Sequence, residues 1–260
     1  MPLETGKIRV ARDGPMAVLT LDNPPVNALR SDMLLEIGQR VESLPKEGVR
    51  VLVLTGAGNN AFCAGADVEE MASLDLAAGG VVQRQGQEIM WRVEHAGLIT
   101  IAAINGFCAG GGLELALACD LRVASDRARF SAPEVNFGLI PAYGGTQRLP
   151  RTVGKAKAKE LILTAKTIRA DEALRLGLVN QVLPDGEELR AAQDLAMQIA
   201  SKAPLAVMAA KRAIDEGWEK HYMNGFVAET RYFQQVLQSA DLKEGILAFL
   251  EKRQAKFTGK

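Results

Sequence analysis

Ten residues near the middle of the chain, Asn105–Glu114, combine three consecutive glycines with a carboxylate. An apolar run, Ile99–Ile104, leads into this segment, and a helical pattern, Leu113–Cys119, follows it with Glu114 in its first turn. Glycine allows close approach to the backbone, and a helix N-terminus presents unpaired N–H groups at the positive end of its dipole. The segment predicts a cradle for a small anionic oxygen. Close packing of a helix on a strand, or a nucleotide-type loop, would use the same glycines.

Two further segments carry related groups. Ala61–Asp67 is a loop of small residues after a predicted strand, in which Asp67 could start a helix. Phe130–Glu134 places a glutamate directly after proline in an apolar setting, ahead of the glycine-containing stretch Gly138–Arg148. Each segment alone has an ordinary alternative, a βα loop in the first case and a solvated loop charge in the second.

Taken together, the three segments predict a site. One backbone N–H from each of the first two would form a two-donor oxyanion hole, and Glu114 and Glu134 would flank the carbons beside the bound carbonyl. Two carboxylates that share a small apolar pocket cannot both ionise easily, so one pKa rises. One can then act as general acid and the other as general base near neutral pH. The predicted chemistry is proton transfer next to a carbonyl, through an enolate.

Short β-branched runs alternate with helical patterns through the first part of the chain. Strands are predicted at Met16–Leu21, Val49–Thr55, Thr100–Ile104 and Leu121–Ala124, and the continuity of the second indicates burial on both faces. Helices are predicted at 31–44, with Ser31 as the cap, from Asp67, and at 80–96. This alternation predicts an α/β fold with parallel strands.

After Pro150 the strand signals nearly vanish, and Ala, Leu, Lys, Arg and Glu dominate. Helical patterns occupy 155–164, 170–176, 187–202, 204–216, 222–239 and 241–255. The last pattern carries an apolar stripe at helical spacing, which indicates packing on its own core or on another subunit.

Composition limits the possible functions. The 260 residues are 48% hydrophobic, and 31 basic residues balance 31 acidic ones, so no net charge favours nucleic acid or an anionic membrane. Cys63, Cys108 and Cys119 are widely spaced, which predicts buried reduced thiols in a cytoplasmic protein rather than metal ligands. We find no signal-peptide pattern and no apolar run long enough to span a bilayer.

The motifs, in their order along the chain, resemble those of the crotonase superfamily of enoyl-CoA hydratases and isomerases. Phe62–Asp67, Ile104–Ala116 and Pro141–Arg151 carry the resemblance, which covers essentially all of the chain. It implies a crotonase-like spiral of ββα turns, with the coenzyme A (CoA) site and the active site in residues 1–200. Residues 201–260 would form a C-terminal helical region that builds trimers, often stacked as hexamers.

The same resemblance implies roles for individual residues. It places the oxyanion-hole N–H groups on Ala66 and Gly111 and the two catalytic carboxylates of hydratases on Glu114 and Glu134. The implied reaction is addition of water to trans-2-enoyl-CoA, a step of fatty-acid β-oxidation, although butyrate metabolism and aromatic degradation stay open. Glu134 would donate a proton to Cα, and Glu114 would orient the water as the base. No metal or redox cofactor is expected.

Further residues are implied to bind the substrate. The backbone of Ala64, Gly65 and Asp67 would hold the adenine end and the pantetheine, and Phe249 and Lys252 on the last helix would meet the adenine and the 3′-phosphate. Ala142 and Tyr143 would line the water and acyl pocket. Ala142 replaces the usual glycine, which puts the water geometry in doubt, and Glu69 stands where many members carry a lysine near the CoA phosphates.

Two alternatives remain at this point. A Δ3,Δ2-enoyl-CoA isomerase would need only Glu134, and some family members bind RNA. The latter carry a lysine-rich helix, whereas the predicted helix 31–44 has Arg40 as its one basic residue. The favoured prediction is a cytoplasmic hydratase that assembles as a trimer or hexamer, acts on acyl-CoA thioesters and binds neither nucleic acid nor membrane.

Overall fold

The computed structural model describes residues 7–72, 75–218 and 222–260. The chain divides into two compact units, Met1–Ala196 and Met197–Lys260. The first unit contains both sheets, and the second contains helices and a C-terminal tail. The functions expected of residues 1–200 and 201–260 stay predictions.

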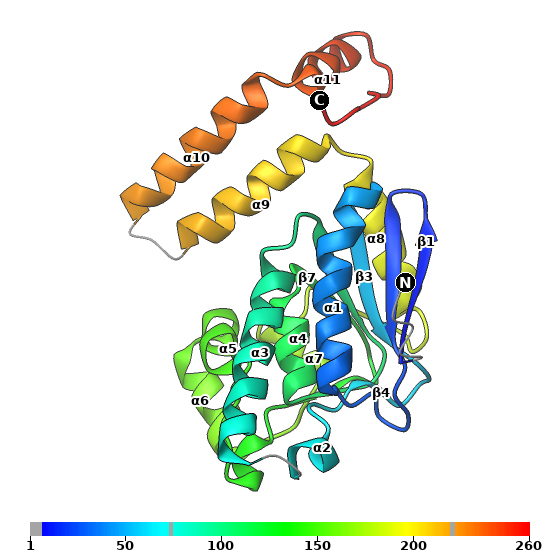
Figure 1. Cartoon of the computed structure of the whole chain (residues 1–260). Helices are drawn as coiled ribbons and strands as arrows, with labels where there is room; N and C mark the ends of the chain where they lie inside the picture. The colour runs from blue at the N-terminus through cyan, green and yellow to red at the C-terminus, as the bar shows by residue number, and fades with distance from the viewer. Residues whose placement is uncertain (1–6, 73–74, 219–221) are drawn as a thin grey trace. The chain divides into compact units, whose positions relative to one another are not determined.

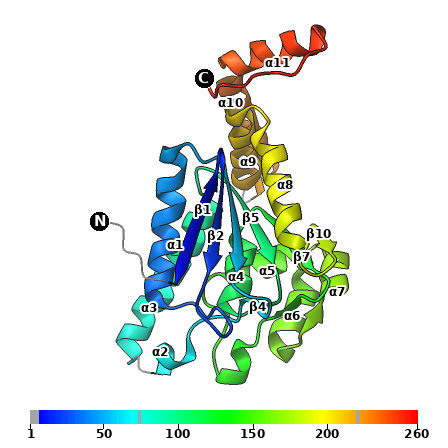
Figure 2. The same ribbon diagram turned by 90° about the vertical axis from the view of Figure 1, so that its right-hand side faces the viewer.

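The first unit is built on two sheets. One has the strand order β1 (Ile8–Asp13), β2 (Met16–Leu21), β3 (Val51–Gly56), β5 (Ile99–Ile104), β7 (Leu121–Ser125) and β10 (Gln181–Leu183), and Figure 2 shows it from β1 to β10. The other has the order β4 (Ala61–Cys63), β6 (Phe107–Ala109), β8 (Arg129–Ser131) and β9 (Ile168–Arg169). Neighbouring strands are parallel, except that β1 runs antiparallel to β2 and β9 to β8.

The chain moves repeatedly from the first sheet to the second and then into a helix. Strand β3 is followed by β4 and by the helices α2 (Val68–Ala72) and α3 (Leu76–Glu94), and β5 is followed by β6 and α4 (Gly111–Ala118). Strands β7 and β8 repeat the step before η2 (Glu134–Phe137), α5 (Gly145–Val153), α6 (Lys155–Thr164) and α7 (Ala170–Arg175). The predicted spiral of ββα turns is therefore confirmed.

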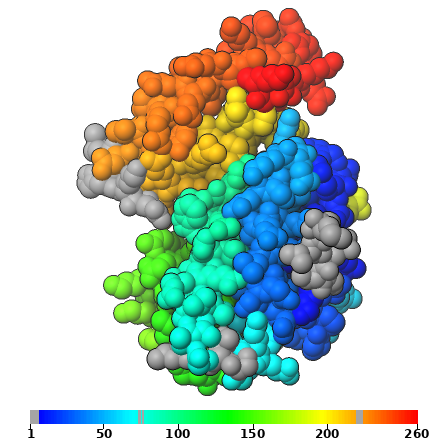
Figure 3. Space-filling view, in the orientation of Figure 1, coloured from blue at the N-terminus to red at the C-terminus, as the bar shows by residue number. Residues whose placement is uncertain are grey.

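Helices cover the sheets and complete the core. Helix α1 (Ser31–Ser43), which continues into the 3-10 turn η1 (Leu44–Glu47), lies beside α3, and their surfaces adjoin in the space-filling view (Figures 1 and 3). Every residue of β3 and β5 is buried. All eight residues of α4 are buried too, which explains why this helix is apolar on nearly every face.

Four of the longer strands follow the sequence prediction closely, whereas the six-residue strand β1 was not predicted. Strands β2, β3, β5 and β7 match the four predicted strands within two residues, and β3 is buried on both faces as expected. The short strands β4, β6, β8 and β9 escape prediction because two or three residues show no alternation. Strands β9 and β10 lie beyond Pro150, where the sequence has almost no strand signal.

The start of α1 corrects the sequence analysis. Arg30 is the N-cap, Ser31 is the first helical residue, and the buried Ser31 hydroxyl has no hydrogen-bond partner among the described residues. A side chain distant in the sequence replaces the local cap, because the Ser31 N–H donates to Glu70 Oε2 at 2.9 Å. Similarly, Asp75 accepts a hydrogen bond from the Ala78 N–H, so α3 begins before the predicted residue 80.

The predicted C-terminal helices are present. They are α8 (Glu188–Ala200), α9 (Pro204–Trp218), α10 (Tyr222–Leu237) and α11 (Ala240–Leu250). Helix α11 ends five residues before the predicted position 255, and Lys252 has a φ of 54°, which is not helical. Within the described residues, no helix has the length and apolar character needed to cross a membrane.

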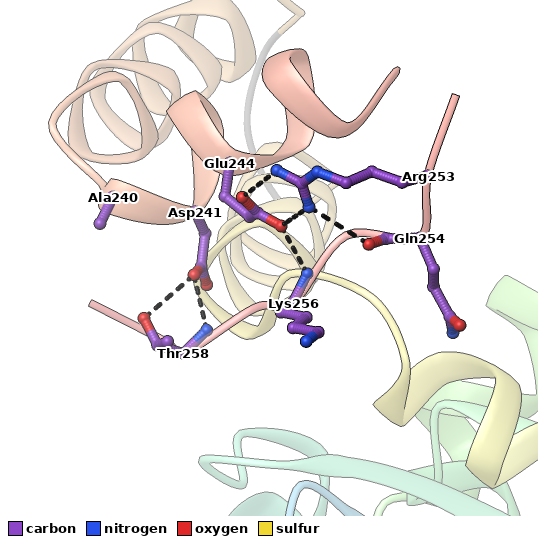
Figure 4. Close-up of a pocket in the computed structure, with 7 residues that line it drawn as sticks. All are labelled: Ala240, Asp241, Glu244, Arg253, Gln254, Lys256 and Thr258. Carbon is purple, nitrogen blue, oxygen red and sulfur yellow. Dashed lines mark hydrogen bonds and ion pairs between the residues drawn. The ribbon is translucent and has the colours of Figure 1, made fainter. Parts of the chain in front are cut away.

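Two carboxylates of α11 hold the C-terminal tail of the second unit (Figure 4). Asp241, 2% exposed, accepts hydrogen bonds from the Thr258 N–H at 2.7 Å and the Gly259 N–H at 2.8 Å. Glu244 pairs with the Arg253 guanidinium and accepts a hydrogen bond from the Lys256 N–H at 2.7 Å. The tail therefore folds back along α11 through charge-assisted hydrogen bonds.

We expect Asp241→Ala to release this tail. Each lost hydrogen bond to the carboxylate is worth about 1.5–3 kcal/mol, so the amides of Thr258 and Gly259 should exchange much faster with deuterium. Glu251→Ala is the matched control, because Glu251 is an exposed carboxylate that forms an ion pair with Arg253 but accepts no hydrogen bond from the Thr258 or Gly259 N–H. Unchanged exchange in Asp241→Ala would show that Asp241 does not hold the tail.

Candidate active site

The first element of the site is the close approach of α4 to the end of β4. Strands β4 and β6 are parallel neighbours, with Cys63 paired to Cys108, so the loops that follow them leave the sheet side by side. A Cβ on Gly112 would lie 2.2 Å from the Cys63 carbonyl oxygen. Only glycine allows α4 to begin this close to the loop, so the close packing that the sequence left as an alternative use of the glycine run is present at Gly112.

The two predicted oxyanion donors lie together at this point. A Cβ on Gly111 would be 3.5 Å from the Ala66 nitrogen. Leu29 fixes the loop by accepting a hydrogen bond from the Asp67 N–H and donating one to Gly65. Neither the Ala66 N–H nor the Gly111 N–H donates a hydrogen bond to any described residue. Two unpaired donors at a buried helix N-terminus are suited to bind an anionic oxygen.

Glu114 projects from the first turn of α4 and is 4% exposed. Its Oε1 accepts hydrogen bonds from the Tyr143 and Gly145 N–H groups, both at 2.7 Å. Burial raises its pKa to about 8, the two N–H groups partly offset this, and the charge of Glu134 adds to the rise. Glu114 is therefore a carboxyl of fixed orientation that exchanges its proton near neutral pH.

Glu134 approaches the same helix terminus from η2. A Cβ on Gly110 would lie 3.4 Å from Glu134 Oε1. Its other oxygen, Oε2, is buried without a hydrogen-bond partner among the described residues. Burial raises the pKa of Glu134 as well. An unpartnered buried carboxyl oxygen is satisfied most readily by a bound water or by its own proton.

A small cavity separates the two carboxyl groups. Its volume is about 10 Å³, and both Glu114 and Glu134 line it. This is close to the space that one water molecule needs. The remaining lining is apolar or glycine and comprises Gly110, Leu113, Leu117, Ala132, Pro141, Gly145 and Leu149. The structure thus brings the two predicted carboxylates to one water-sized, largely apolar space.

The loop before α5 provides the support for Glu114. Arg148 donates a hydrogen bond to the Tyr143 carbonyl at 3.1 Å and forms an ion pair with Glu94 at 2.6 Å. The Ala142 carbonyl accepts a hydrogen bond from Gln83 at 3.1 Å. Sequence reasoning assigned this loop to the water through Ala142 and missed the N–H groups of Tyr143 and Gly145. Two glycines just before a helix are the signal that could have indicated them.

The predicted CoA-binding loop is partly occupied by its own hydrogen bonds. The Ala64 N–H donates to Val26 and the Asp67 N–H donates to Leu29, so these two donors are not available to a ligand. Asp67 also accepts a hydrogen bond from the Glu70 N–H, which lowers its pKa and caps α2. The prediction that Ala64, Gly65 and Asp67 bind CoA therefore depends on their other backbone groups.

Phe249 and Lys252 belong to the second unit. Phe249 is 83% exposed near the end of α11, and Lys252 lies beyond the helix rather than on it. Their contact with adenine and phosphate stays a prediction. Among the described residues, no three His, Cys, Asp or Glu side chains are grouped as metal ligands, and the three buried cysteines form no disulfide.

Comparison with known families identifies the chain. A family model described as enoyl-CoA hydratase/isomerase matches residues 12–260. The chain belongs to this family. Among curated members of the enoyl-CoA hydratase/isomerase family, a short-chain-enoyl-CoA hydratase of Clostridium acetobutylicum is 41% identical over 96% of this chain and 97% of its own length. A crotonyl-CoA hydratase of Syntrophomonas wolfei is 42% identical over 97% and 98%.

Solved structures of the family share the fold. The crystal structure of an enoyl-CoA hydratase from Bacillus anthracis superimposes with a TM-score of 0.95 at 38% identity, covering 98% of this chain and 100% of that one. The described ββα turns and the C-terminal helices are therefore the family architecture.

The raised pKa of Glu114 predicts how stability changes with pH. The unfolded chain releases this proton near the ordinary value of 4.5, whereas the folded protein keeps it to about 8. Between these values the folded state binds more protons, so its stability falls as pH rises. We expect Glu114→Gln to gain stability relative to wild type from about pH 5 to about pH 8, measured by denaturant unfolding.

Leu149→Val is the matched control, because it changes a buried apolar side chain that lines the same cavity but carries no titrating group. Its stability difference from wild type should not depend on pH. A Glu114→Gln difference that is equally constant would contradict the raised pKa.

Proposed function

We propose that this protein is an enoyl-CoA hydratase, which adds water reversibly to trans-2-enoyl-CoA and forms 3-hydroxyacyl-CoA. Two carboxyls, that of the buried Glu114 and that of the half-buried Glu134, line a cavity the size of one water beside two unpaired N–H groups, and this arrangement carries the proposal. Relatives named short-chain-enoyl-CoA hydratase and crotonyl-CoA hydratase support it.

Polarisation of the substrate is the first step of the proposed reaction. The thioester oxygen accepts hydrogen bonds from the N–H groups of Ala66 and Gly111, which draws electron density from the Cα–Cβ double bond. As water adds at Cβ, negative charge develops on this oxygen as an enolate. Fixed donors in a buried site stabilise that charge better than they stabilise the neutral carbonyl, and one such donor is worth about 3–4 kcal/mol.

The carboxyls divide the proton transfers. Glu114 is the base in its ionised form. Two N–H groups fix its Oε1, and a pKa of about 8 leaves part of it ionised near neutral pH while making that carboxylate a strong proton acceptor. It takes a proton from the water as the oxygen bonds to Cβ. Glu134, whose Oε2 has no partner among the described residues, delivers its proton to Cα on the same face. Transfer of the proton from Glu114 back to Glu134 completes the cycle, and no metal or redox step is required.

The proposal includes a homo-oligomer, a trimer or a dimer of trimers. Large apolar side chains of the second unit, Phe226, Val227, Phe233, Ile246, Phe249 and Leu250, are between 46% and 83% exposed. Burial between copies of the chain would remove this surface from water. Three buried cysteines that form no disulfide fit a reducing compartment, so we place the protein in the cytoplasm, with fatty-acid β-oxidation as the favoured setting.

Glutamine substitutions test the two-carboxylate mechanism. We expect Glu114→Gln and Glu134→Gln each to lower kcat for hydration of crotonyl-CoA by about 10²–10⁴-fold, because each removes a proton-transfer group while keeping the shape of the side chain. Loss of absorbance of the conjugated enoyl thioester measures the rate. Glu36→Gln is the control, since Glu36 is equally buried but pairs with Arg40 on α1.

Other outcomes would favour the alternatives. Double-bond migration in a 3-enoyl-CoA that depends on Glu134 alone, without hydration, would identify an isomerase. Salt-sensitive binding of RNA by a protein without either activity would identify a non-enzymatic member of the family.

A further inference from the structure

The side chain of Tyr143 is buried next to the candidate active site although its backbone alone holds Glu114. Tyr143 is 8% exposed, and its N–H donates to Glu114 Oε1. The ring contributes nothing to that hydrogen bond. The ring therefore has a role separate from that hydrogen bond, and it lies between two glycines, Gly86 and Gly111.

One edge of the ring is set against α3. A Cβ on Gly86 would lie 2.3 Å from both Cδ1 and Cε1 of Tyr143. No real side chain tolerates such a distance, so α3 can lie this close to the ring only because residue 86 is glycine. The ring and the glycine are complementary in shape.

The opposite edge of the ring faces the oxyanion donor. A Cβ on Gly111 would lie 3.4 Å from Cδ2 and Cε2, which is ordinary contact distance. The ring therefore fills the space between Gly86 on α3 and Gly111 on α4. Burial, with the charges of Glu114 and Glu70, raises the pKa of the phenol to about 12, so Tyr143 stays a neutral wall at physiological pH.

This position matters for a substrate whose carbonyl oxygen is bound at the Gly111 N–H. The acyl carbons are attached to that carbonyl, so they begin within a few bond lengths of the ring. On the side of the two carboxyls, the cavity that both groups line has a volume of only about 10 Å³ and is closed by leucines and a proline. An acyl chain that extends from the bound carbonyl past the ring has to displace Tyr143 if it is long, whereas a short chain ends before the ring.

We infer that the Tyr143 ring, seated against Gly86, closes the acyl end of the site and restricts the protein to short-chain enoyl-CoA thioesters. The inference rests on the proposed hydratase function and adds a specificity-determining residue to it. The carboxyls and the oxyanion donors act on any chain length, and the ring decides which chains reach them.

A series of substrates tests this inference. kcat/KM is measured for crotonyl-CoA, 2-octenoyl-CoA and 2-dodecenoyl-CoA with wild type, Tyr143→Phe and Tyr143→Ala. We expect wild type and Tyr143→Phe, which keeps the ring, to prefer crotonyl-CoA. Tyr143→Ala should raise the ratio of dodecenoyl to crotonyl hydration by about 10-fold or more, the discrimination that pocket volume typically provides.

A second substitution checks the contact with α3. In the wild-type background, Gly86→Ala should lower both stability and crotonyl-CoA hydration, because the added methyl meets the Tyr143 ring. In the Tyr143→Ala background the same substitution should leave the fold and crotonyl-CoA hydration intact. There it should reduce the newly gained long-chain activity. Tyr143→Leu gives an intermediate volume if Tyr143→Ala does not fold. This coupling between residues 86 and 143 is not expected if the ring only adds stability.

The outcomes separate the inference from the proposed function. Absence of crotonyl-CoA hydration by wild type would contradict the hydratase itself. Hydration that is equally fast for all three substrates in wild type would overturn the inference and leave the hydratase intact. The same holds if Tyr143→Ala and Tyr143→Leu lower all three rates by one factor.

Discussion

The close contact between the N-terminus of α4 and the end of β4 is the constraint on which the rest of the site depends. Gly112 lies against the Cys63 carbonyl, and this contact sets Gly111 beside Ala66. The two donors come from different turns of the spiral, so neither turn can form the anion site alone. The parallel pairing of Cys63 with Cys108 fixes the register that brings the turns together. The proposed binding of the thioester oxygen thus depends on backbone geometry that a short second sheet provides.

The same packing buries the Glu114 carboxyl, and the free-energy cost of removing it from water has to be offset by other groups. Helix α4 is buried throughout, so a carboxyl in its first turn loses its hydration. Two N–H groups from the Tyr143–Gly145 loop replace part of that hydration, and Arg148 fastens the loop to Glu94. These hydrogen bonds do not fully replace the lost hydration of the carboxylate, so the pKa of Glu114 stays raised. The energetic cost of burial is therefore what gives the carboxyl a useful proton affinity near neutral pH.

The sequence predicts the parts of this arrangement that local patterns encode. Long buried strands such as β3 and β5, the C-terminal helices, and the pairing of a glycine run with Glu114 all follow from composition and spacing. Strands of two or three residues carry no periodicity, so the second sheet emerges only from the family resemblance and the structure. Contacts between distant segments are also invisible to local patterns. The cap on Ser31 comes from Glu70, and the donors to Glu114 come from a loop some thirty residues later.

Tyr143 shows why backbone and side chain should be considered separately in this site. Its N–H orients Glu114, a function that any residue except proline can supply, whereas its ring occupies the space between α3 and α4. The chemistry is thus insulated from changes in the side chain, because substitution alters the volume beside the oxyanion donor without removing the hydrogen bond. Gly86 adds a second adjustable position. It lies on α3 against the Tyr143 ring, so residues 86 and 143 can change together while the carboxyls and the N–H donors stay in place.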